Sequence, residues 1–92
     1  MAIVRVHIFI EGKVQGVFYR SWLKGQAESL GLTGWVKNLE DGRVEAIIQG
    51  PKEKVEDLVQ KCRQGSSVSR VSHTDVIYEE VVDDLIGFSI IS

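Results

Sequence analysis

The chain has 92 residues, a length that suits one compact domain with a single hydrophobic core. Apolar residues make up 43% and charged residues 26%, which is ordinary globular composition and argues against disorder or a fibrous repeat. The formal net charge of −2 supplies no basic field for nucleic acid or an acidic membrane surface, so any anion must be bound by local groups. We therefore predict one domain over residues 1–92 that binds neither nucleic acid nor membrane.

The cysteine content and the N-terminal sequence bear on the compartment. Cys62 is the single cysteine, so no intrachain disulfide can form. The N-terminal residues lack the cationic lead, apolar run and small-residue cleavage site of a secretion signal, and no apolar stretch nears the roughly 20 residues of a membrane-spanning helix. We expect a cytoplasmic protein, and a monomer because no heptad pattern is present.

The first third of the chain predicts a strand, a loop and a helix. Residues 3–10 are rich in β-branched and aromatic side chains, and the apolar residues at even positions alternate with Arg5 and His7, as in a strand with one buried face. Gly12 and Gly16 then mark a loop. A helix follows from about Ser21 and ends before Gly31, with three apolar residues at helical spacing: Leu23, Ala27 and Leu30.

The rest of the chain predicts a hairpin, a second helix and two further strands. Residues 33–39 and 43–49 are strand-like and are joined through Asp41-Gly42, a strong hairpin signal. Gly50-Pro51 opens a helix whose apolar residues follow the i, i+3, i+4, i+7 pattern: Val55, Leu58, Val59 and Cys62. Two more strands are expected over residues 69–78 and 86–91, separated by an acidic stretch.

This order of elements defines a fold class. The sequence β-α-β-β-α-β with an added terminal strand is the split βαβ, or ferredoxin-like, α+β sandwich. Its two helices are expected to cover one face of an antiparallel sheet. In such a sheet the first and second strands each lie beside the third, so residues near their ends can share one site.

The loop before the first helix is a candidate anion site. Glycines free the backbone there, and amide groups at a helix N-terminus can converge on an anion with help from the helix dipole. Arg20 lies where the loop meets the helix, and its planar guanidinium can bind two phosphate or carboxylate oxygens at once. An ordinary glycine-containing connection with a solvated arginine would show the same pattern, and the segment lacks the GK[ST] ending of a nucleotide-binding loop.

Asn38 is the second candidate. Asn is a poor strand former, yet Asn38 sits near the end of the strand over residues 33–39. Its amide could be placed there for function, or the residue could simply end a strand before a turn. Because the fold brings the ends of these elements together, Arg20 and Asn38 could face one site.

Two segments resemble the signatures of the acylphosphatase family. GKVQGVFYR (residues 12–20) resembles the loop pattern G-x-V-Q-G-V-x-F-R, and GWVKNLEDG (residues 34–42) resembles the second signature. The resemblance covers the whole length and element order. It implies hydrolysis of the carboxyl-phosphate bond of acyl phosphates to carboxylate and inorganic phosphate. Tyr19 departs from the pattern, which usually has Phe there, and its hydroxyl needs a partner if it is buried.

The resemblance also implies residue roles. Arg20 would bind the substrate phosphate, and Asn38 would orient the attacking water. The phosphate would be cradled by the backbone amides of six consecutive residues: Gln15, Gly16, Val17, Phe18, Tyr19 and Arg20. The leaving carboxylate has a conjugate acid with a pKa of roughly 4, so no general acid is needed, and the scheme requires no metal or cofactor. All these contacts grip the phosphate, so the motifs do not identify the acyl group.

The remaining polar and aromatic residues are expected to have structural roles. His7 and His73 have no Cys, Asp or Glu at metal-ligand spacing and are predicted to lie on the sheet face or the surface. Cys62 is expected to be an inert core thiol, and the acidic residues within 79–84 a solvated loop. Two tryptophans are expected to be packing residues rather than stacking platforms: Trp22 and Trp35.

Two rival functions share the predicted fold. One is a non-catalytic ferredoxin-like module that binds a small anion, since fold alone does not fix function. RNA and copper are disfavoured as ligands because residues 43–49 have no stacking aromatics and the chain has no CxxC. The other is an acylphosphatase-like domain that handles carbamoyl phosphate within a larger maturation enzyme, which the length of this chain argues against.

Overall fold

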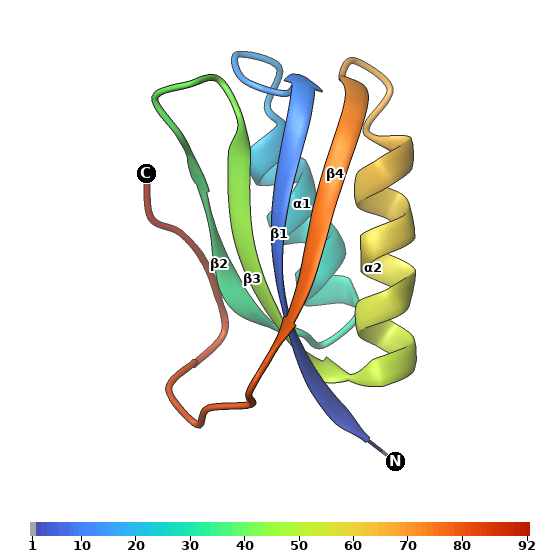
Figure 1. Ribbon diagram of the computed structural model, residues 1–92, viewed down its shortest axis with the longest axis vertical. Coiled ribbons are helices and arrows are strands. Elements are labelled where there is room, and N and C mark those ends of the chain that lie inside the picture. Colours follow the sequence, from blue (N-terminus) through green and yellow to red (C-terminus); the bar gives the residue numbers. More distant parts are fainter. Residues whose placement is uncertain (1) are drawn as a thin grey trace.

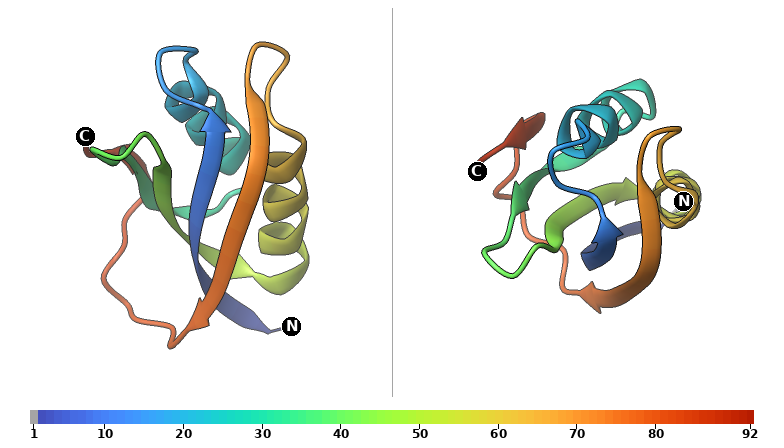
Figure 2. Two further views of the ribbon diagram at one scale, coloured as in Figure 1. Left: turned by 45° about the horizontal axis from the view of Figure 1, so that its top comes forward. Right: turned by 90° about the horizontal axis from the view of Figure 1, so that it is seen from above.

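Alternating β-branched strands and two amphipathic helices build a sheet with helices on one face, described for residues 2–92 in a computed structural model (Figure 1). The elements are β1 (Ile3–Lys13), α1 (Tyr19–Ser29), β2 (Thr33–Asn38), β3 (Val44–Pro51), α2 (Lys52–Gln64), β4 (Arg70–Glu79) and β5 (Phe88–Ile90). Across the described residues the sheet order is β4-β1-β3-β2-β5. Figure 2 shows both helices over the same face of the sheet.

The predicted ferredoxin-like α+β class is confirmed, with one refinement in the sheet. β1 pairs antiparallel with both β3 and β4, and β2 pairs antiparallel with β3. The terminal strand β5 adds to the outer edge of β2 in the parallel direction. The sheet is therefore mixed, because the chain returns from the far end of β4 through a long connection before it enters β5.

The hydrophobic core lies between the sheet and the helices. Alternate residues of β1 and β3 face it, as the period-two pattern of a one-sided strand predicts. α1 contributes residues spaced four apart, and α2 contributes the predicted apolar stripe. The fully buried side chains of these elements include Val6, Ile8 and Ile10 of β1, Leu23 and Ala27 of α1, and Val55, Leu58 and Cys62 of α2.

The first loop is shorter than the sequence predicts. β1 continues past Ile10 to Lys13, and its register with β4 shifts between Glu11 and Gly12, where Ser72 of β4 is the extra residue. Gly12 has a φ of 133°, and a Cβ there would lie 2.0 Å from the carbonyl oxygen of Arg70. Gly12 is thus a strand residue at a close backbone approach, and the prediction that the loop begins at Gly12 is wrong.

The open face of the sheet carries a polar network around His7. Its Nε2 lies 2.5 Å from Glu45 and its Nδ1 lies 2.9 Å from Glu79. Nearby, Arg5 binds Asp84 at 2.9 Å and thereby ties the connection between β4 and β5 to the sheet. The predicted sheet-face position of His7 is confirmed. The acidic connection is largely exposed, as expected, but Asp84 also anchors it.

The end of the sheet that holds the β1–α1 loop also holds the β2–β3 turn and the C-terminal end of the chain (Figures 1 and 2). These segments come from distant parts of the sequence. The hairpin turn falls at residues 40–42, as predicted, with the Leu39 amide donating to the Arg43 carbonyl at 2.8 Å. Within residues 2–92, no helix is both long and apolar enough to span a bilayer.

Candidate active site

The loop between β1 and α1 has an unusual backbone. Gly16 has a φ of 72° and Phe18 a φ of 59°, so two left-handed residues flank Val17. A Cβ at Gly16 would meet no atom within 4 Å, which means that conformation and not space calls for glycine there. Amides beside left-handed residues form concavities that bind anions. The local backbone therefore suits a phosphate.

The helix that follows reinforces this property. α1 begins at Tyr19, two residues before the predicted start, and the Trp22 amide donates to the Phe18 carbonyl at 3.0 Å. The first turn of α1 contains no acidic residue, so no side-chain carboxylate there offsets the positive end of the helix dipole. Arg20 stands in this same turn.

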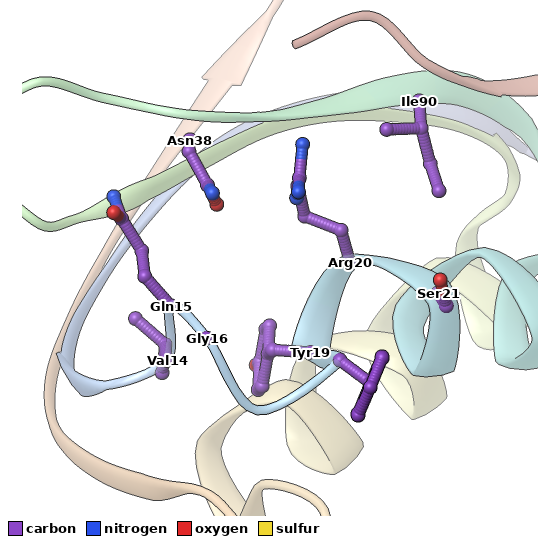
Figure 3. A pocket seen from close by; sticks show the side chains of 9 residues that line it. Val14, Gln15, Gly16, Tyr19, Arg20, Ser21, Asn38 and Ile90 are labelled. Atoms are coloured by element: carbon purple, nitrogen blue, oxygen red, sulfur yellow. The ribbon is translucent and has the colours of Figure 1, made fainter.

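A pocket of about 290 Å³ lies between this loop, the end of β2 and β5. Figure 3 shows the side chains of Arg20 and Asn38 side by side in it, one from α1 and the other from β2. Nine residues line the pocket: Val14, Gln15, Gly16, Phe18, Tyr19, Arg20, Ser21, Asn38 and Ile90. Of the predicted site residues, Val17 is not among them and instead packs against the core. Arg20 and Asn38 are brought together as the fold argument predicted.

The guanidinium of Arg20, which lines the pocket, is hydrogen-bonded to the C-terminal segment. Its Nη1 donates to the main-chain oxygen of Ser92. The same oxygen accepts a hydrogen bond from the main-chain amide of Asn38 at 3.2 Å. Ser92 thus ties the arginine of α1 to the end of β2. The sequence carried no signal for this contact, because it joins residues 72 positions apart.

The Oδ1 atom of Asn38 is buried and has no hydrogen-bond donor among the protein groups of residues 2–92. A buried acceptor left unsatisfied costs about 1–3 kcal/mol. Native proteins therefore pair nearly all such atoms, and exceptions often mark functional positions. Asn38 also lines the pocket, beside Arg20. Its carbonyl oxygen thus has unused capacity to accept a hydrogen bond beside the pocket.

Gln15 has a role that the sequence reasoning missed. Its side-chain amide donates to the carbonyl of Leu39 at 2.8 Å and to that of Arg43 at 2.9 Å. The loop is thereby braced to the β2–β3 turn, at the residue directly after Asn38. The predicted role of Gln15 rested on its backbone amide, whereas the structure adds side-chain hydrogen bonds to the turn that follows Asn38.

Asp41 forms hydrogen bonds within the β2–β3 turn to which Gln15 binds. Its carboxylate accepts hydrogen bonds from the main-chain amide of Arg43 at 3.0 Å and from the Arg43 side chain at 2.8 Å. These bonds lower the pKa of Asp41 below its ordinary value. Gln15 therefore binds a turn that already has a defined shape.

Tyr19, the one departure from the loop pattern, points into the core. It is 1% exposed, and its hydroxyl donates to the main-chain carbonyl of Cys62 at 2.8 Å. Burial raises the pKa of Tyr19. Burial also raises the pKa of the Cys62 thiol to about 12, although the hydrogen bond with Tyr19 acts in the opposite direction. The core position predicted for Cys62 is confirmed.

The other histidine lies away from the pocket. His73 is exposed on β4 and contacts Asp75 at 3.0 Å. No three His, Cys, Asp or Glu side chains within residues 2–92 gather closely enough to hold a metal ion. Trp22 packs partly against the core, 5.2 Å from the Tyr19 ring, as expected of a packing residue. Trp35 is half-buried on the open face, where its ring meets that of His7 edge-on.

Comparison with known proteins identifies the family. The acylphosphatase family profile matches residues 6–90. An acylphosphatase of Roseiflexus sp. is 45% identical over 91 residues, covering 99% of this chain and 98% of that protein. One of Haloarcula marismortui is 46% identical over 80 residues, covering 87% and 88%. The crystal structure of the acylphosphatase from Bacillus subtilis superimposes with a TM-score of 0.92 at 34% identity, covering 97% of this chain and 99% of that one. The chain therefore belongs to the acylphosphatase family.

Proposed function

We propose that the protein hydrolyses the carboxyl-phosphate bond of acyl phosphates to carboxylate and inorganic phosphate. Arg20 and the loop amides of residues 15–20 bind the phosphate, and Asn38 orients the attacking water. The observation that supports this assignment best is the buried, unpartnered Oδ1 of Asn38, which lines one pocket with Arg20. Family membership supports the reaction class, and the geometry supports the division of roles.

The reaction is an in-line displacement at phosphorus. The water oxygen forms a bond to phosphorus while the bond from phosphorus to the carboxyl oxygen breaks, so that R-CO-O-PO₃²⁻ and H₂O give R-COO⁻ and H₂PO₄⁻. The leaving carboxylate is a weak base, because its conjugate acid has a pKa of roughly 4, and needs no general acid. One proton of the water passes to a phosphate oxygen, since the Asn38 amide is not a base.

Catalysis then depends on position and charge. Phosphoryl transfer gains most from groups that stabilise the charge on the equatorial oxygens. The guanidinium of Arg20 and the amides at the start of α1 provide such groups on one side of the pocket. Asn38 stands on another side, at the end of β2. The proposed scheme includes no metal or other cofactor.

The proposal is tested by hydrolysis of acetyl phosphate in the presence of a chelator. Wild type is expected to turn over the substrate. Arg20→Gln should raise KM and nearly abolish turnover because it removes the cation that binds the phosphate. Arg70→Gln is the matched control, since Arg70 is exposed on β4 and outside the pocket. If the wild-type protein has no activity, the proposed hydrolase function is wrong. If the wild type is active without the chelator and inactive with it, the metal-free scheme is wrong.

The role of Asn38 is tested separately. Asn38→Ala should lower kcat about 100-fold, as loss of one positioned polar group typically does, while inorganic phosphate still inhibits competitively with a similar constant. An unchanged kcat would contradict the water-orienting role. Phosphate binding by wild type without any turnover would instead support the rival reading, a ferredoxin-like small-anion-binding module.

A further inference from the structure

The pocket has a polar side and an apolar side. Arg20, Asn38 and the loop amides form the polar side, which the proposed function assigns to the phosphate. Phe18 and Ile90 line the same pocket from the loop and from β5. No role in the proposed hydrolysis is assigned to either of these two side chains.

Folding alone does not explain the phenyl ring of Phe18. The side chain is 84% exposed, whereas that of the next residue, Tyr19, is 1% exposed. Phe18 adopts the left-handed conformation, with φ 59° and ψ 25°, which costs a non-glycine residue about 1–2 kcal/mol. It also occupies the N-cap of α1 without a side-chain hydrogen bond, at a position where Gly or Asn would serve better. Strained residues at such positions cluster at functional sites.

Ile90 reaches the pocket through the pairing of β5 with β2. Ile90 lies opposite Val36 in the parallel register, and the Ile91 amide donates to the Val36 carbonyl at 3.0 Å. The same strand β2 carries Asn38 two residues further on. Ile90 remains 39% exposed. Two partly exposed apolar side chains from opposite ends of the sequence thus lie on one pocket.

We propose that Phe18 and Ile90 form an apolar acyl-binding rim that makes the enzyme prefer acyl phosphates with an apolar, ring-sized acyl group. This inference rests on the proposed function, because binding of the phosphate to Arg20 is what places the acyl group at the pocket mouth. The substrate joins a charged phosphate to an acyl group, and the pocket joins a cationic side to an apolar one. A ring that covers roughly 50 Å² of apolar surface there gains about tenfold in binding.

The rim is tested by comparing benzoyl phosphate with acetyl phosphate. The two substrates carry the same phosphate and similar leaving groups but differ in apolar area. Phe18→Asn removes the ring with a residue that tolerates the left-handed conformation. It should lower the ratio of kcat/KM for benzoyl phosphate to kcat/KM for acetyl phosphate about tenfold. Ile90→Thr, which keeps a β-branched residue in β5, should shift the same ratio in the same direction by a smaller factor.

The control is Ile86→Ser, a change at a 97% exposed apolar residue outside the pocket, which should leave the ratio at its wild-type value. Circular dichroism melting establishes that each variant is folded. A ratio that stays constant in both rim variants overturns the inference. Equal losses for both substrates in Phe18→Asn also overturn it, because they would show that Phe18 acts through loop conformation. Wild type that hydrolyses neither substrate would instead overturn the proposed function.

Discussion

At the scale of single residues, three consecutive side chains at the start of α1 lie in different surroundings. Phe18 is largely exposed at the pocket, Tyr19 is buried in the core, and Arg20 is a charged group of the pocket lining. Tyr19 anchors the start of α1 through its bond to the Cys62 carbonyl. That carbonyl belongs to the last turn of α2, where carbonyls have no partner within the helix. The tyrosine hydroxyl therefore joins the N-terminal end of one helix to the C-terminal end of the other.

We expect Tyr19→Phe to lower the free energy of unfolding by about 1–3 kcal/mol. The change keeps the ring but removes the donor to a buried carbonyl, which is then left unsatisfied. Urea unfolding at neutral pH measures the difference. Tyr78→Phe, at an exposed tyrosine on β4, is the matched control and should change stability little. Equal stability of Tyr19→Phe and wild type would show that the hydroxyl contributes nothing to this junction.

At the scale of elements, the geometry of the site depends on how three segments are joined. The Gln15 side chain links the β1–α1 loop to the β2–β3 turn. Ser92 links the segment after β5 to both α1 and β2. Arg20 and Asn38 thus belong to elements connected near the pocket by side-chain as well as backbone bonds, which limits their relative motion.

Gln15→Leu should lower kcat about tenfold, because the loop loses two hydrogen bonds to the turn that positions Asn38. Stability should fall by about 1–2 kcal/mol because two partly buried hydrogen bonds are lost, although each carbonyl keeps a main-chain donor. Steady-state kinetics with acetyl phosphate measures the first effect. Combining Gln15→Leu with Asn38→Ala makes the test specific to Asn38. If Gln15 acts through Asn38, its effect on kcat should largely vanish in the double variant, whereas simple additivity would contradict that route.

At the scale of the whole molecule, the order β4-β1-β3-β2-β5 is what assembles the site. It places the end of β2, with Asn38, near the β1–α1 loop although the two segments are about 20 residues apart in the chain. It also adds β5 next to β2, so that the last residues of the chain reach the same pocket. Both helices cover one face of the sheet. Tyr19 of α1 and Cys62 of α2 are buried and joined by a hydrogen bond on that side of the sheet.

The protein should lose stability progressively as the pH rises from about 9 to about 12. Burial raises the pKa of Tyr19 above its ordinary value of 10.0 and that of Cys62 from 9.0 to about 12. Above about pH 9 the unfolded chain therefore loses protons that the folded chain keeps, and stability falls by at most about 1.4 kcal/mol per pH unit per group. Urea unfolding at a series of pH values measures the slope. Cys62→Ala should make it shallower, and a flat profile would contradict the burial argument.

Much of the architecture was predictable because it rests on local signals. Strand alternation, the apolar stripe of α2 and Asp41-Gly42 at the hairpin are properties of neighbouring residues, and they predicted the elements and the ferredoxin-like order. The extension of β1 through Gly12 was not predictable. That glycine lies where the register of β1 with β4 shifts, close to the main-chain carbonyl of Arg70, and the two residues approach only after the sheet has formed.

The sequence by itself determined the family, the fold class and the two side chains, Arg20 and Asn38, that line the pocket together. These follow from residue types and spacings, which are local. Only the tertiary structure decided that Gln15 braces the hairpin and that Tyr19 bonds to α2. It also placed Phe18 and Ile90 on one pocket. The reason is that each of these contacts joins segments far apart in the chain, and pairing at that distance is set by sheet order and packing rather than by neighbouring residues.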